Sequence, residues 1–160
     1  MDVNQLKNYV IIPSISAIGM YSVEAVQLLL MTCATETHLG QYIKQANLGY
    51  NDGAFGIYQQ QALSYNELYD NLITPSQSMT AKMRLYLNYV GKPPVQRLMT
   101  DCALATIMAR MFYHNIPEPI PEATNVEALA YYYKKYYNTE MGKAKVPEVI
   151  TAYKLLVLKC

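Results

Sequence analysis

A single carboxylate stands where an apolar helical stretch meets a glycine-rich segment. Glu36 follows the apolar residues of 23–34, and four of the seven glycines lie in the next segment, 38–63. A carboxyl group at such a junction is placed to lose part of its hydration. Desolvation raises its pKa, as a general acid near neutral pH requires. A glutamate at a helix end is more often a solvated surface charge, so Glu36 alone leaves both interpretations open.

The glycine-rich segment contains a second group of residues suited to ligand contact. It includes the run Gly53-Ala54-Phe55-Gly56-Ile57-Tyr58-Gln59. Its two glycines permit tight turns and the close approach of a ligand to the backbone. Gln59 offers an amide donor and an amide acceptor, which suit a sugar hydroxyl or an N-acetyl group.

The elements that must position these residues are predicted to be almost all helical. Apolar residues recur at helical spacing, and capping signals precede most of the segments. We expect helices after Ser22, after Ser64 with Glu67 as a capping box, from Thr74-Pro75 to Gly91, over 95–113, after Asn125 and from Pro147. The prolines of 116–121 predict a stiff extended crossing. The segment 38–63 has no sustained period, and we expect a long functional loop there.

Composition limits the class of protein. Lys+Arg 13 against Asp+Glu 12 gives a net charge of +1, which argues against a nucleic-acid partner. Hydrophobic residues make up 52% and charged residues 16%, so we expect one soluble domain with a real core over 1–160. No stretch reaches the roughly 18 apolar residues that a membrane span needs, and no secretory signal is visible at the N-terminus.

Cysteine and tyrosine usage adds two expectations. Cys33, Cys102 and Cys160 lie too far apart for a zinc motif, so we expect no metal site. We expect the three thiols to have a structural role, with Cys160 exposed. Tyr 16 beside Trp 0 and Phe 2 suits a sugar-binding groove or a protein interface. Ordinary core packing explains the tyrosines equally well.

The motifs resemble those of one enzyme superfamily. Glu36-Thr37, followed by Gly53 to Gln59, resembles the Glu-Ser and Gly-Ala-x-Gly-Leu-Met-Gln signature of lytic transglycosylases and goose-type lysozymes. Ala128-Leu129-Ala130-Tyr131-Tyr132 is similar to a later motif whose tyrosine hydroxyl reaches the catalytic glutamate, a role that would fall to Tyr132. Packing within a helix is the alternative for Tyr132. The residues of 133–139 depart from the usual sequence pattern of the family. They resemble the corresponding segment in lysozyme-like proteins of tailed bacteriophages.

The resemblance covers about 22–140 and implies both a fold and an activity. The fold would be an all-α, lysozyme-like domain with the glycine-rich loop at its active site. The activity would be cleavage of the β-1,4 bond between N-acetylmuramic acid and N-acetylglucosamine in peptidoglycan, with Glu36 as acid and base and no cofactor. The residues implied in substrate binding are Gly53, Phe55, Gly56, Tyr58, Gln59 and Tyr132. Implied partners, besides glycan strands, are other virion proteins of a phage tail or baseplate, with the host cytoplasm as the location before assembly.

Two alternatives stay open. Asp52 is a candidate second carboxylate, because hydrolysis with inversion needs one about 6.5–9.5 Å from the acid. Asn51-Asp52-Gly53 is also an ordinary turn sequence, the interpretation we favour. The whole chain could instead be a non-catalytic tail or baseplate protein that keeps the lysozyme-like fold, since tyrosine and methionine are enriched at interfaces.

Overall fold

The computed structural model describes residues 1–139 and 142–159, most of which are helical. The α-helices are α1 (Val3–Gln5), α2 (Ile12–Ala17), α3 (Val23–Thr37), α4 (Ala62–Leu68), α5 (Gln77–Leu87), α6 (Cys102–His114), α7 (Val126–Tyr133) and α8 (Val146–Tyr153). Wider π-helical turns follow four of them: η1 (Leu6–Ile11), η2 (Tyr69–Ile73), η4 (Lys134–Asn138) and η5 (Lys154–Leu158). η3 (Val95–Met99) is a 3-10 helix, and β1 (Ala54–Phe55) pairs antiparallel with β2 (Gln60–Gln61). The all-α class predicted from the sequence is confirmed.

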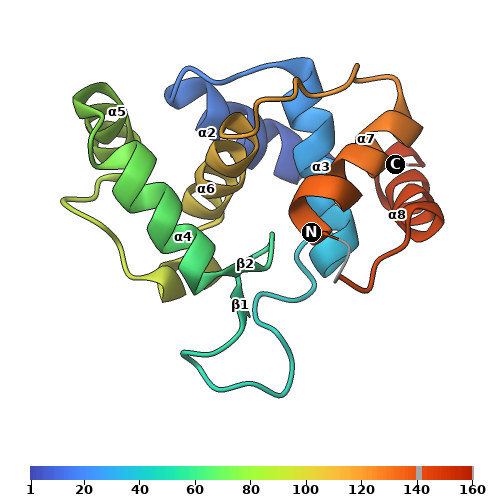
Figure 1. Cartoon of the computed structure of the whole chain (residues 1–160), viewed down its shortest axis with the longest axis horizontal. Helices are drawn as coiled ribbons and strands as arrows, with labels where there is room; N and C mark the ends of the chain where they lie inside the picture. The colour runs from blue at the N-terminus through green and yellow to red at the C-terminus, as the bar shows by residue number, and fades with distance from the viewer. Residues whose placement is uncertain (140–141, 160) are drawn as a thin grey trace.

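Helix α3 is the centre of the fold. It packs against α6, α7, α8 and η1, and most of its residues are buried. In Figure 1, α4 and α5 lie on one side of α3 and α6, whereas α7 and α8 lie on the other. The chain after α3 leaves the helices as a long loop and returns through β1 and β2 (Figure 1). The segment 38–61 is therefore the long loop that the sequence predicts, with a small hairpin at its end.

Two predicted helix starts are confirmed by their capping bonds. The Ser22 hydroxyl accepts a hydrogen bond from the Ala25 N–H at 3.1 Å. The Asn125 side chain accepts one from the Ala128 N–H at 3.0 Å. Each cap satisfies a backbone donor that the first turn of a helix leaves without an intrahelical partner.

Four predicted boundaries are wrong, and the local backbone and other caps explain why. Helix α4 begins at Ala62 rather than after Ser64, because β2 leads the extended chain directly into it. Helix α5 is capped by Ser76, since Thr74 still continues the preceding helical turn, and it ends at Asn88, whose φ is 56°, before Gly91. The segment 95–113 is two helices, because Asp101 accepts from the Leu104 N–H at 2.9 Å and starts α6 anew.

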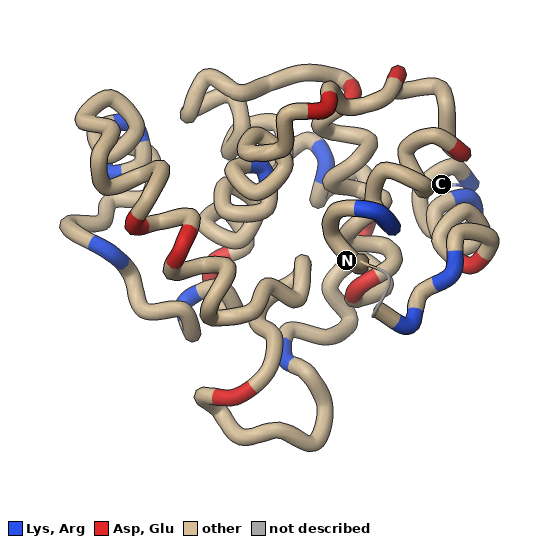
Figure 2. Tube along the Cα trace, viewed as in Figure 1, with Lys and Arg blue, Asp and Glu red and all other residues tan. Residues whose placement is uncertain are grey.

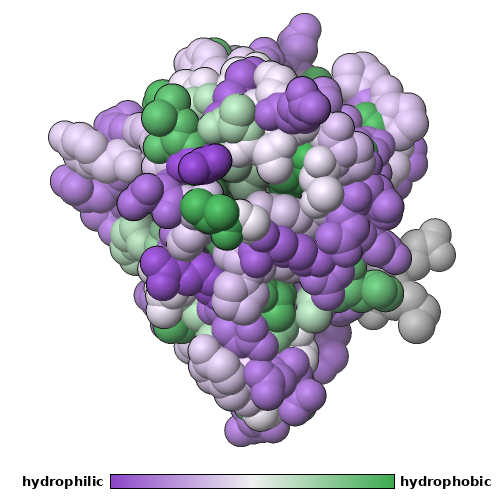
Figure 3. Space-filling view, turned by 90° about the vertical axis from the view of Figure 1, so that its left-hand side faces the viewer, coloured by the Kyte–Doolittle hydropathy of each residue, from purple (hydrophilic) through white to green (hydrophobic). Residues whose placement is uncertain are grey.

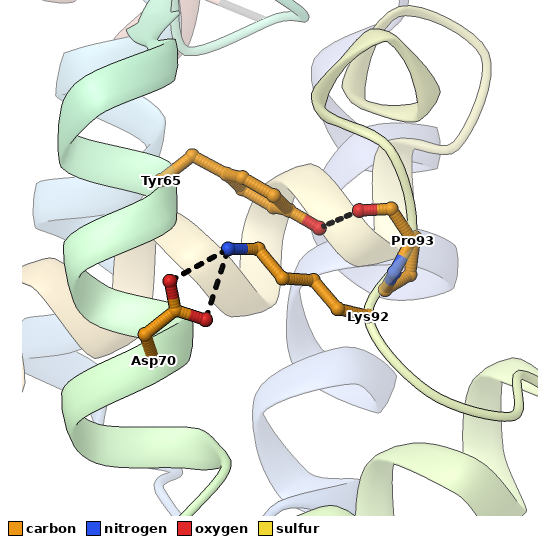
Figure 4. Close-up of polar contacts among 4 residues, drawn as sticks. All are labelled: Tyr65, Asp70, Lys92 and Pro93. Carbon is orange, nitrogen blue, oxygen red and sulfur yellow. Dashed lines mark hydrogen bonds and ion pairs between the residues drawn. The ribbon is translucent and has the colours of Figure 1, made fainter.

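The connection between α5 and η3 is tied to α4 and η2 by polar contacts that Figure 4 shows. The Tyr65 hydroxyl donates to the Pro93 carbonyl at 2.6 Å, and the Lys92 ammonium contacts both carboxylate oxygens of Asp70 at 2.9 Å. The Lys92–Asp70 ion pair is partly exposed and is worth about 0–1 kcal/mol at most. The buried Tyr65 bond is the firmer tie, and together they fix the point from which η3 approaches the loop.

Gly56 is the point where η3 meets the loop. It has φ +73°, and a Cβ built on it would lie 2.4 Å from the Leu98 carbonyl oxygen. Its N–H donates to the Ile43 carbonyl at 2.9 Å. Close approach by a ligand was the predicted reason for this glycine, but the group that approaches it is the backbone of η3. Gly56 therefore shapes the loop.

The five largest fully buried side chains among the described residues are tyrosines with satisfied hydroxyls. They are Tyr58, Tyr65, Tyr113, Tyr133 and Tyr153. Their hydroxyls contact, in that order, Thr106, the Pro93 carbonyl, Thr32, Glu36 and Gln27. Because a buried hydroxyl needs a partner, tyrosine in these places both fills the core and links two elements. Much of the tyrosine surplus is thus core packing.

Charges and apolar residues are both distributed over the surface. Figure 2 shows basic and acidic positions spread from α5 to the C-terminal helices over the described part of the chain. Seen from the α5 side, apolar residues reach the surface in separate patches among polar ones (Figure 3). Within residues 1–139 and 142–159, no helix combines the length and the apolar character that crossing a bilayer requires.

Candidate active site

Glu36 lies half-buried on the last turn of α3. The helix ends at the next residue, because His38 takes the left-handed conformation with φ 49°. Thr37 connects this helix end to the loop: its hydroxyl donates to the Ile57 carbonyl at 2.7 Å and accepts from the Gly40 N–H at 3.0 Å. The Thr37 hydroxyl therefore holds the loop against the helix turn that carries Glu36.

The carboxyl of Glu36 is held by one tyrosine. The Tyr133 hydroxyl donates to Glu36 Oε1 at 2.5 Å. Burial raises the pKa of Glu36, and the hydrogen bond from Tyr133 opposes part of that rise by stabilising the carboxylate. The pKa of Tyr133 is also raised, first by burial and then by the charge of Glu36, so its hydroxyl stays protonated as a donor. Among the described residues, the only ion pairs are Lys92–Asp70 and Lys135–Glu118, so no salt bridge holds Glu36 ionised.

The prediction that the Tyr132 hydroxyl reaches Glu36 is wrong. The Tyr132 hydroxyl donates to the Glu118 carbonyl at 2.8 Å instead. Consecutive residues of a helix point about 100° apart, so Tyr132 and Tyr133 on α7 cannot face the same partner. Tyr131, Tyr132 and Tyr133 follow one another, and only the way α7 packs on α3 decides which of them meets the acid.

Glu36 opens into a cleft of about 580 Å³. The α3 end, the loop, β2 and α4 form one part of the cleft, and α6 and the chain after α7 form the other. The lining residues are Glu36, Gln45, Ala54, Gln59, Gln60, Gln61, Ser64, Phe112, Tyr136, Tyr137, Asn138, Thr139 and Gly142. Glu36 is the only charged side chain in this set. The cleft thus combines one acid with amides, hydroxyls and aromatic rings, a composition suited to a neutral polar ligand.

Gln59 lines the cleft, but part of its amide is already used. Its Nε2 donates to the Gly56 carbonyl at 2.9 Å, and its backbone has φ 47°. This bond braces the turn between β1 and β2. The side chain therefore both shapes the loop and presents its remaining polar capacity to the cleft.

Other loop residues predicted to bind substrate do not line the cleft. Phe55 and Tyr58 are fully buried, and the Tyr58 hydroxyl contacts Thr106 in the core. Gly53 has φ +77° in an exposed turn and does not line the cleft either. The prediction of ligand contact is corrected for Phe55 and Tyr58, because the antiparallel β1–β2 hairpin directs these side chains into the protein.

Asp52 lies in an exposed turn outside the cleft lining. Its N–H donates to the Gly49 carbonyl at 3.1 Å, and its carbonyl accepts from the Lys44 ammonium. This geometry fits the turn interpretation. Among the described residues that line the cleft, Glu36 is the sole acid.

Several cleft residues were not predicted from the sequence to belong to the site. Gln45, Gln60, Gln61, Ser64, Phe112, Tyr136 and Tyr137 are seven of them. Gln60 is notable because it is 4% exposed and neither Oε1 nor Nε2 has a hydrogen-bond partner among the described residues. An unsatisfied buried polar group costs about 1–3 kcal/mol. Two adjacent glutamines after the Gly-x-x-Gly-x-x-Gln motif were the available signal, but nothing in the sequence marks one as buried.

The described residues offer no evident metal site. Over residues 1–139 and 142–159, no three His, Cys, Asp or Glu side chains gather closely enough to hold an ion. Cys33 and Cys102 are free thiols, and burial raises the pKa of Cys33 to about 12, which makes it a poor nucleophile. The expectation for Cys160 lies outside the described residues.

Comparison with known proteins adds no relative: no family model, no curated protein and no solved structure matches the chain.

We expect Tyr133→Phe to move the pH dependence of any activity that needs protonated Glu36. The hydrogen bond from Tyr133 stabilises the carboxylate, so removing it raises the pKa of Glu36 further. The alkaline limb of the pH–rate profile should then shift to higher pH. Tyr132→Phe is the matched control, because Tyr132 contacts the Glu118 carbonyl, and its profile should not move. An equal shift in both variants would contradict this assignment.

Thr37→Val should loosen the loop from α3. Valine keeps the shape but leaves the Ile57 carbonyl and the Gly40 N–H without their partner, at a cost of about 1–3 kcal/mol in the free energy of unfolding. Thr37→Ser keeps the hydroxyl, so its free energy of unfolding should fall much less. Urea unfolding compares the two variants, and amide exchange over 40–57 should quicken in Thr37→Val only. Equal stability of the two would show that the hydroxyl is dispensable.

Proposed function

We propose that the chain is a peptidoglycan-cleaving muramidase of the lytic transglycosylase type, with a lysozyme-like fold. The observation that carries the proposal is the environment of Glu36: a half-buried carboxyl with a raised pKa, bound by a tyrosine hydroxyl and open to a cleft without other charged groups among its described lining residues. These are the requirements of a general acid acting on a neutral glycan near neutral pH.

Glu36 would first donate its proton to the oxygen of the β-1,4 bond. The bond between C1 of N-acetylmuramic acid and that oxygen then breaks, and the leaving N-acetylglucosamine keeps the proton. The Glu36 carboxylate next takes the proton of the muramyl 6-hydroxyl, whose oxygen bonds to C1 and closes a 1,6-anhydro ring. The proton returns to Glu36, so one carboxyl suffices. The single acid among the described cleft residues suits this route better than inversion, which needs two.

The aromatic part of the cleft supports a sugar ligand. Phe112 and Tyr137 pack edge to face with centroids 5.0 Å apart, and Tyr137 stacks on Tyr133 at 6.0 Å. The Tyr137 hydroxyl donates to the Tyr58 carbonyl at 2.7 Å, which ties η4 to the loop. The rings are thus held in place before a ligand arrives, and the apolar faces of pyranose rings pack well on such surfaces.

A structural role is the alternative that one surface favours. A groove of about 780 Å³ runs along α5 and the residues after it, where Leu85 is 88% and Val90 84% exposed. Exposed apolar side chains that gather along one groove are typical of protein interfaces. A non-catalytic tail or baseplate subunit of a phage particle would use this surface and have no need of Glu36. A virion-borne muramidase would use both, so the activity of the cleft separates the alternatives.

The proposal is tested with purified cell wall. The full chain should clear a gel loaded with peptidoglycan, and mass spectrometry of the products should find 1,6-anhydro ends. Reducing muramic acid ends in their place would keep the muramidase but overturn the transglycosylase route. No cleavage of walls from any of several peptidoglycan types would leave the structural role as the better account.

A further inference from the structure

The Gln60 side chain is an unusual one to find buried in the protein. Strand β2 pairs Gln60 with Phe55, and the neighbouring Gln61 points outward and is exposed. Side chains alternate along a strand, so Gln60 takes the inward position, where an apolar side chain is the usual occupant. Instead a glutamine is buried there with both amide atoms unpartnered among the described residues. Such groups are rare in folded proteins and call for a partner that the described residues do not supply.

The neighbours of Gln60 narrow the chemistry of that partner. Gln60 lines the same cleft as Glu36, Phe112 and Tyr136. No lysine or arginine belongs to the described lining, so an anionic ligand has no counter-charge there. Gln59 already donates its Nε2 to the Gly56 carbonyl, whereas Gln60 is the cleft amide that is buried with both polar atoms unpartnered among the described residues. The partner is therefore a neutral group that offers both a hydrogen-bond acceptor and a donor next to apolar surface.

We infer that Gln60 is a specificity-determining residue that binds the acetamido group of an N-acetylated sugar in the cleft. Its Nε2 donates to the acetamido carbonyl oxygen, and its Oε1 accepts from the hydroxyl at the adjacent ring carbon. The acetamido methyl packs against the aromatic side of the cleft. This inference rests on the proposed function for the class of substrate, but it concerns recognition rather than bond cleavage.

The test measures preference between two neutral oligosaccharides. The probes are β-1,4-linked tetramers of N-acetylglucosamine and of glucose, which differ at each sugar in the acetamido group. Binding is measured by calorimetry in the Glu36→Gln chain, so that no probe is cleaved. That chain should bind the acetylated tetramer more tightly. Adding Gln60→Leu should reduce this preference by about tenfold, as expected for lost hydrogen bonds to a neutral group.

A matched substitution controls for the added leucine. Gln41 is exposed and does not line the cleft, so Gln41→Leu should leave the preference unchanged. Gln60→Leu itself should keep or raise the melting temperature, because it removes an unpartnered buried amide. An unchanged preference in Gln60→Leu, or an equal loss for both tetramers, overturns the inference. No binding of the acetylated tetramer by the Glu36→Gln chain overturns it as well.

A second measurement covers the case in which Gln60→Leu does not fold. In the ¹⁵N-labelled Glu36→Gln chain, the side-chain amide signals of Gln60 should shift when the acetylated tetramer is added and stay in place with the glucose tetramer. Signals indifferent to both tetramers would show that the amide binds only internal water, which overturns the inference.

Failure of this inference and failure of the proposed function look different. If the wild-type chain cleaves peptidoglycan while Gln60→Leu keeps its preference, the muramidase proposal stands without this subsite. If the preference depends on Gln60 and no variant or wild-type chain cleaves cell wall, the subsite stands in a protein that binds glycan without cutting it.

Discussion

Glu36→Gln should remove cell-wall cleavage while leaving the fold intact. Glutamine keeps the shape and can still accept the hydrogen bond of Tyr133, but it has no proton to donate to a glycosidic oxygen. General acid–base catalysis contributes about 10²–10⁴-fold, so turbidity clearing should fall by a factor in that range. The remaining cleavage should be near the detection limit of the assay.

The stability of the Glu36→Gln chain checks that the loss is chemical. Burial raises the pKa of Glu36 in the folded chain above its unfolded value. Above both values the unfolded chain accommodates the carboxylate better, so at neutral pH this group destabilises the fold. Glu36→Gln should therefore show an equal or higher melting temperature at neutral pH. The gain should fade as the pH falls from the raised pKa of Glu36 toward the ordinary pKa of a glutamate, and it should be absent below that ordinary value.

Two carboxyl substitutions serve as controls. Asp52→Asn should leave cleavage nearly intact, because Asp52 lies in an exposed turn outside the cleft lining. Glu122→Gln removes an exposed carboxylate before α7 and should have no effect. An equal loss of activity in Glu36→Gln and Asp52→Asn would point to a two-carboxylate hydrolase. Full activity in Glu36→Gln would show that Glu36 is not the general acid.

Gly56→Ala should be among the most destabilising single substitutions in the loop. The left-handed backbone alone costs an alanine about 1–2 kcal/mol. The new methyl group would also lie 2.4 Å from the Leu98 carbonyl oxygen, a backbone atom that cannot move aside without shifting η3. We expect a loss of about 3–4 kcal/mol in the free energy of unfolding, which urea titration measures.

Gly91→Ala isolates the steric part of this effect. Gly91 has φ +79°, close to that of Gly56, but nothing lies within 4 Å of a Cβ built on it. Gly91→Ala should therefore lower the free energy of unfolding only by the conformational cost, about 1–2 kcal/mol. The difference between the two variants measures how tightly η3 packs on the loop. Equal losses would mean that η3 and the loop are not in close contact.

The sequence determined the local features of this protein. Apolar periodicity and the caps at Ser22 and Asn125 sufficed to predict α3 and α7, because one side chain and the first turn of a helix decide a cap. The prolines of 116–121 likewise predicted the extended crossing, since each one fixes its own φ. The sequence also placed Glu36 at a helix end beside a long loop. The N-terminal helices α1 and α2 were not predicted.

Tertiary structure decided everything that depends on which face of an element meets another. The sequence could not choose between Tyr132 and Tyr133, because only the docking of α7 on α3 turns one of them toward Glu36. It could not show that Gly56 faces the η3 backbone, or that Gln60 is buried. Caps and turns depend on bonds between near neighbours, whereas a cleft joins groups from distant parts of the chain. Their meeting depends on the summed packing of the whole fold.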